Sequence, residues 1–211
     1  MVPPGFDDHA IAVHDGLLRQ ALREIRSTTA TPGHRIAWAR IAEHALEHLP
    51  ETEERLAETL STARELLDSP ESVQRLIGGI WSCAGCRSYD GTWTRLVRWV
   101  IDLADRAIRG EHWATFARLA HVAVRLDGVK PTLTPEWERG IRAAHEMPSA
   151  WVSLYLIAYH CARRLEQTEK NSPFPEWLRL LREDQRLTEA YRTECSLEDE
   201  VQCRVCRRVD P

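Results

Sequence analysis

The chain has 211 residues, a formal net charge of −4 and 43% hydrophobic residues. This length suits one large domain, which can bury its own core without help from disulfides or a metal. The slight excess of acidic residues argues against a protein that coats nucleic acid or an anionic membrane surface.

The N-terminal residues, Met-Val-Pro-Pro-Gly-Phe-Asp-Asp, lack the basic and apolar regions of a signal peptide. The longest apolar stretch, at 150–162, is shorter than the roughly 20 residues that cross a bilayer. We therefore expect a cytoplasmic protein with no membrane partner. In that reducing compartment, its six cysteines are more often metal ligands, redox groups or buried thiols than a disulfide framework.

Apolar residues recur with helical spacing along nearly the whole chain, and capping residues, prolines and glycines divide them into segments. Asp7 or Asp8 can cap the first segment, and Thr31-Pro32 can start the second. Gly78-Gly79 weakens the fourth segment, since each glycine costs about 1 kcal/mol relative to alanine. The expected helices run from Asp8 to Arg26, Pro32 to Pro50, Leu56 to Leu67, Ser69 to Trp81, Thr92 to Arg109, Glu111 to Leu126, Thr134 to Met147, Ala150 to Gln167 and Glu176 to Tyr191, and a short last helix starts at Ser196.

These segments predict an all-α fold, a compact multi-helix bundle of about nine or ten helices. No stretch shows the sustained two-residue alternation of a strand. Gly110 suits the position that follows the end of a helix, so the fifth and sixth helices should form an antiparallel hairpin. We expect residues 1–192 to form the helical bundle domain, and residues 193–211 to form a cysteine-containing tail that packs on it.

Two Cys-x-x-Cys pairs are the main candidate site. Cys83 and Cys86 follow the fourth helix, and Cys203 and Cys206 lie near the C-terminus. Four thiolates complete a closed tetrahedral zinc site, which would fix the tail to the end of the fourth helix. Cys195 belongs to a competing ligand set with the C-terminal pair. Buried or independent thiols and a redox or iron–sulfur role are the alternatives.

A second candidate site lies on the second helix. His44 and His48 are four residues apart and therefore share one helical face, as do Glu43 and Glu47. Imidazole and carboxylate groups at this spacing can bind zinc or iron. The order differs from His-Glu-x-x-His, in which the glutamate follows the first histidine, so we favour a solvated face. The His14-Asp15 dipeptide is also expected to be solvated.

The sequence favours a non-enzymatic helical interaction or regulatory protein with a protein partner and a structural, cysteine-rich zinc site. The first alternative is a helical metal-dependent enzyme or enzyme subunit that uses His44, His48 and nearby carboxylates. The second is an accessory protein that contacts nucleic acid through Arg204, Arg207 and Arg208. Nucleic acid is a less favoured partner than protein. No phosphate-binding loop, nucleophile elbow or kinase signature is present.

Overall fold

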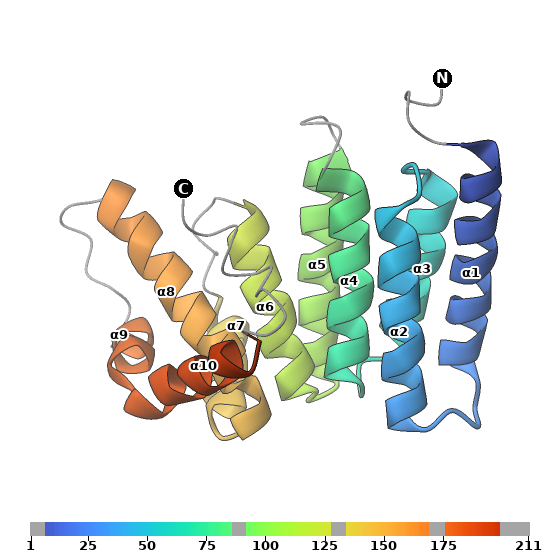
Figure 1. Cartoon of the computed structure of the whole chain (residues 1–211). Coiled ribbons are helices and arrows are strands. Elements are labelled where there is room, and N and C mark those ends of the chain that lie inside the picture. The colour runs from blue at the N-terminus through green and yellow to red at the C-terminus, as the bar shows by residue number, and fades with distance from the viewer. Residues whose placement is uncertain (1–6, 86–91, 128–133, 169–175, 199–211) are drawn as a thin grey trace.

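The computed structural model describes residues 7–85, 92–127, 134–168 and 176–198 (Figure 1). Within these ranges the chain is helical and contains no strand, which confirms the predicted all-α class. The α-helices are α1 (Asp8–Arg26), α2 (Pro32–Glu47), α3 (Glu53–Glu65), α4 (Pro70–Gly85), α5 (Thr92–Arg109), α6 (Trp113–Asp127), α7 (Pro135–His145), α8 (Trp151–Thr168), α9 (Glu176–Glu183) and α10 (Gln185–Glu198), with a 3-10 turn, η1 (Pro148–Ala150), before α8.

The helices stand side by side in a row, from α1 at one edge to α8, with α9 and α10 beside α8 (Figure 1). The even-numbered helices follow one another, because α2 packs on α4, α4 on α6, α6 on α8 and α8 on α10. The odd-numbered helices pack beside them: α1 contacts α2 and α3, and α5 contacts α4, α6 and α7. Helix α1 is therefore the end helix of the row.

Capping residues set several helix starts where the sequence predicts them. The Asp7 side chain accepts a hydrogen bond from the His9 amide at 3.1 Å, and the Thr31 hydroxyl accepts one from the His34 amide at 3.2 Å. Each of these bonds satisfies an amide that has no partner within the helix. The predicted first, second and fifth helices begin at the expected residues.

The predicted ninth helix is wrong, because the chain breaks at Asp184 into α9 and α10. The Asp184 carboxylate accepts a hydrogen bond from the Arg186 amide at 2.9 Å, so it competes for the backbone at this point. Ser196, predicted to start a separate last helix, lies inside α10. The proposed boundary between residues 192 and 193 stays a prediction.

The turn between α5 and α6 differs by one residue from the prediction. Glu111, and not Gly110, adopts the left-handed conformation, with a φ of 58°. The His112 amide donates to the Ala107 carbonyl at 2.9 Å, and the Glu111 amide donates to the Ile108 carbonyl at 3.2 Å. These two bonds form a Schellman motif, in which Gly110 is the cap and Glu111 is the residue after it.

Gly78 and Gly79 do not interrupt α4, which continues to Gly85. They instead allow α4 to approach α2 closely. A Cβ atom on Gly79 would lie 2.9 Å from the Cα atom of Glu43 and 2.8 Å from Cδ1 of the fully buried Leu46. Gly79 therefore allows the close spacing between α4 and α2, the helix that carries His44.

None of the helices within the described residues is long and apolar enough to cross a lipid bilayer.

Candidate metal centre

The predicted cysteine site falls largely outside the described residues. Cys86, Cys203 and Cys206 are not described, and neither are Arg204, Arg207 and Arg208. Cys83 lies in the last turn of α4 and Cys195 in the last turn of α10, with their side chains outside the description. Zinc coordination by these thiols therefore stays a prediction.

A histidine cluster lies instead where α1 packs on α2. His44 and His48 project from the last turn of α2 and its cap, and both are exposed. Because α1 and α2 are antiparallel neighbours, the N-terminal half of α1 passes beside this turn and brings His14 to the pair. The His14 ring stacks on His48, with 4.8 Å between their centroids, and lies 5.9 Å from the His44 ring.

The spacing of these rings suits a shared metal ion. The His44 and His48 centroids lie 4.6 Å apart, so the three separations bracket 5 Å. Zinc–nitrogen bonds of about 2.0–2.1 Å in tetrahedral geometry place the centroids of two ligating imidazoles about 5 Å apart. His14 and His48 are stacked at 26°, so the His14 ring would have to rotate for its nitrogen to reach an ion held by His44 and His48.

Glu47 adds a carboxylate to the cluster. One ligand atom from each of His44, Glu47 and His48 can be chosen so that all three lie within 4.8 Å of one another. They form the only such group among the described histidines, cysteines and acidic residues, and His14 is not a member of it. The side chain of His44 is 63% exposed and that of Glu47 is 24% exposed, so the outer side of the cluster is open to solvent.

The surroundings of His14 favour its neutral form, which is the form that binds metal. Partial burial lowers the pKa of His14, and the positive charges that His48 and His44 can carry lower it further. Its Nδ1 atom is shielded from solvent and has no hydrogen-bond partner among the described residues. A shielded nitrogen without a partner is costly unless it gains a ligand or a proton donor.

An ion pair between α1 and α3 holds this region together. Asp15, next to His14, accepts a hydrogen bond from Arg55 Nε at 2.8 Å, and Arg19 contacts the same carboxylate. Partial burial opposes ionisation of Asp15, but the bonds from Arg55 and Arg19 lower its pKa below the ordinary value. Arg55 also donates to the Pro50 carbonyl at 2.9 Å. Arg55 thus ties together the segments that carry His14 and His48.

The expectation of a solvated face holds for His44 and His48, which are exposed. The expectation of a solvated His14-Asp15 dipeptide is wrong, because both residues are partly buried and Asp15 is paired with Arg55. The order His44-x-x-Glu47-His48 is the reverse of His-Glu-x-x-His, and it still puts two imidazoles and a carboxylate on adjoining turns. In the sequence, this order of residues is the signal that indicates the candidate ligands on α2. No sequence spacing predicts His14, because it reaches the cluster through the packing of α1 on α2.

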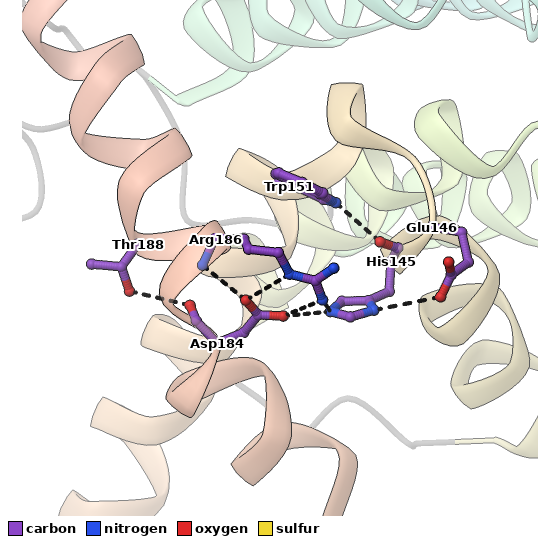
Figure 2. Close-up of polar contacts among 6 residues, drawn as sticks. All are labelled: His145, Glu146, Trp151, Asp184, Arg186 and Thr188. Carbon is purple, nitrogen blue, oxygen red and sulfur yellow. Dashed lines mark hydrogen bonds and ion pairs between the residues drawn. The ribbon is translucent and has the colours of Figure 1, made fainter.

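A second polar cluster joins the end of α7 to the break between α9 and α10 (Figure 2). Asp184 Oδ2 lies 2.8 Å from His145 Nε2 and 2.7 Å from an Arg186 nitrogen. The bonds from Arg186 hold the pKa of Asp184 far below its ordinary value against partial burial, and His145 contributes to the same effect. Trp151 donates to the His145 carbonyl at 3.0 Å, and Arg186 stacks over its ring.

This second cluster is satisfied internally. The Asp184 carboxylate receives its bonds from Arg186 and His145, and it also caps the start of α10. We therefore interpret it as a structural junction for the C-terminal helices, and take the histidine cluster as the candidate functional site.

No protein-family model matches the chain, and the searches of curated proteins and of solved structures likewise return no match.

Proposed function

We propose that the protein is a helical regulatory or interaction protein that binds a divalent transition-metal ion of the zinc class at His14, His44, His48 and Glu47. The observation that carries the proposal is the meeting of three imidazole rings, with centroids 4.6–5.9 Å apart, from two helices. Imidazole nitrogens suit zinc, copper and nickel, whereas calcium and magnesium prefer oxygen ligands.

The electrostatics around the cluster support the same function. Partial burial and the neighbouring His48 and His44 lower the pKa of His14, which keeps that ligand neutral near pH 7. The nearby Glu47 carboxylate can offset part of the charge of a bound cation. Metal binding at this site would join α1 to α2 and so stabilise the end of the helix row.

Calorimetric titration of the chelator-treated full chain with Zn²⁺ tests the proposal. We expect saturable binding, and at a free-zinc concentration of 100 Kd a stabilisation of about 2.7 kcal/mol. The double substitution His44→Ala/His48→Ala should weaken binding by at least about tenfold. The matched control is His9→Ala, on α1 but outside the cluster, which should bind as the wild type does.

The two candidate metal sites can be separated in the same experiment. Cys83→Ser/Cys86→Ser removes half of the predicted thiolate set and leaves the histidine cluster intact. If this substitution abolishes all zinc binding while His44→Ala/His48→Ala has no effect, the histidine site is refuted and the cysteine site is favoured. Zinc content of the wild type against Cys203→Ser and Cys86→Ser then tests the thiolate prediction by itself.

The open outer side of the cluster favours a second candidate function, a helical metal-dependent enzyme. In this alternative Glu47 is not a ligand, and three imidazoles alone would leave one tetrahedral position for water, which is the arrangement of catalytic zinc sites. Glu47 lies beside these ligands and could serve as a base. Zinc-dependent hydrolysis of an activated ester, lost in Glu47→Gln while zinc binding persists, would support this function. A rate equal to that of free Zn²⁺ in buffer would exclude it for that substrate.

A further inference from the structure

The half of α1 that carries His14 has little apolar packing. All the buried residues of α1 lie in its C-terminal half, and they are Leu18, Ala21, Leu22 and Ile25. Within residues 8–17 no side chain is buried, and Ile11 packs on the core only as a partly buried residue. The position of His14 relative to α2 therefore depends on polar contacts more than on core packing.

Arg55 provides such a polar contact from the first turn of α3. Its Nε atom donates to Asp15 Oδ1 at 2.8 Å, and Asp15 directly follows His14. This pair is well shielded, because only 18% of the Arg55 side chain and 17% of the Asp15 side chain are exposed. Asp15 also pairs with Arg19, but that side chain is 67% exposed, and exposed ion pairs contribute little. Arg55 is therefore the main polar anchor of this half of α1.

Arg55 also contacts the chain that follows His48. Its Nη1 atom donates to the carbonyl oxygen of Pro50 at 2.9 Å, two residues beyond His48. The Arg55 amide donates to the Thr52 hydroxyl at 3.4 Å, which caps the start of α3. A planar guanidinium holds its donors at fixed angles. One side chain thus sets the distance between the segments that carry two of the proposed ligands.

We infer that Arg55 is a positioning residue for the metal site, which holds α1 against the chain after α2 so that His14 can reach an ion bound by His44 and His48. This inference rests on the proposed function. A zinc–nitrogen bond of about 2.0–2.1 Å leaves little room for a displaced backbone. Removing the positive charge of Arg55 would by itself favour a bound cation, so weaker binding would indicate lost positioning and not lost charge.

Calorimetric titration of the chelator-treated full chain with Zn²⁺ tests this inference. Arg55→Met removes the donors and keeps the length of the side chain, and it should weaken zinc binding by about tenfold, the low end of the cost of losing a supporting contact around a metal site. The matched control is Arg26→Met. Arg26 also joins α1 to α3, through Glu58 and Glu65, but it lies in the last turn of α1, away from the cluster. This control should bind zinc as the wild type does.

A double-mutant cycle shows whether Arg55 acts through His14. In the His14→Gln background, where the ligands on α2 remain, Arg55→Met should cause no further loss of zinc affinity. An Arg55→Met variant that is folded by circular dichroism and binds zinc as tightly as the wild type would overturn this inference and leave the proposed function standing. So would an equal loss in Arg26→Met, or a loss that persists in the His14→Gln background. A wild type that binds no zinc would overturn both.

Discussion

The close contact between α2 and α4 predicts that Gly79→Ala destabilises the protein, whereas Gly16→Ala, on α1, stabilises it. In Gly79→Ala, the new methyl group would lie 2.9 Å from the Glu43 Cα atom and 2.8 Å from Leu46 Cδ1. Ordinary contacts between such atoms are about 3.5–4.0 Å, so the two helices must separate at the Glu43 backbone, and Leu46 must move as well. Leu46 is fully buried and has little room to move.

Overpacking of this kind costs about 1–3 kcal/mol, and the better helix propensity of alanine returns about 1 kcal/mol. We expect Gly79→Ala to lower the free energy of unfolding by about 1 kcal/mol. Gly16→Ala is the matched control, because a methyl group there meets nothing within 4 Å. It should raise the free energy of unfolding by about 0.5–1 kcal/mol.

Urea denaturation followed by circular dichroism measures both changes. Thermal unfolding should show melting temperatures that move in opposite directions, by about 2–4 °C for each kcal/mol. The close approach of α4 to α2 would be refuted if Gly79→Ala stabilised the protein as much as Gly16→Ala does.

Three further predictions concern local energetics. Glu111→Gly should stabilise the protein by about 1 kcal/mol in urea denaturation, because glycine adopts the left-handed conformation without the cost that an L-residue bears; a loss of stability would count against the turn geometry. Asp184→Ala should destabilise the protein by about 2 kcal/mol at pH 7, because the cap of α10 and the ion pair with Arg186 are lost. The pKa of Asp184 is lowered in the folded state, so the difference in stability from the wild type should shrink below about pH 4. A difference independent of pH would exclude this account. Because the pKa of His14 is lowered in the folded state, the unfolded chain binds more protons, and the stability of the metal-free protein should fall as the pH decreases below about 6.5. In denaturation curves from pH 7 to 5, His14→Gln should reduce the dependence of the free energy of unfolding on pH. An unchanged pH dependence would contradict this prediction.

Local sequence signals predict the helix boundaries because a boundary depends on few neighbouring atoms. Asp7 and Thr31 each cap a helix through an amide only two or three residues away. The break at Asp184 follows the same chemistry, but helical apolar spacing continues across it and hides it. At the α5–α6 turn, the glycine predicts the hairpin correctly and misplaces the left-handed residue by one position.

The candidate site is harder to predict, because its parts meet only through packing. His44, Glu47 and His48 share one stretch of α2 and are visible as a pattern. His14 joins them because α1 folds back along α2. Gly79 allows α4 to approach the backbone of Glu43 on the same helix. Hydrophobic periodicity tells which face of a helix is buried, but it does not tell which helix covers that face.

Zinc K-edge X-ray absorption on the zinc-loaded Cys203→Ser/Cys206→Ser variant tests the central claim most directly, because it identifies the ligand atoms. We predict nitrogen and oxygen neighbours at about 2.0–2.1 Å with imidazole scattering, and no shell of sulfur at about 2.3 Å. Adding His44→Ala/His48→Ala to this variant should remove the bound zinc. A sulfur shell, or zinc retained unchanged without the two histidines, would contradict a metal centre between α1 and α2.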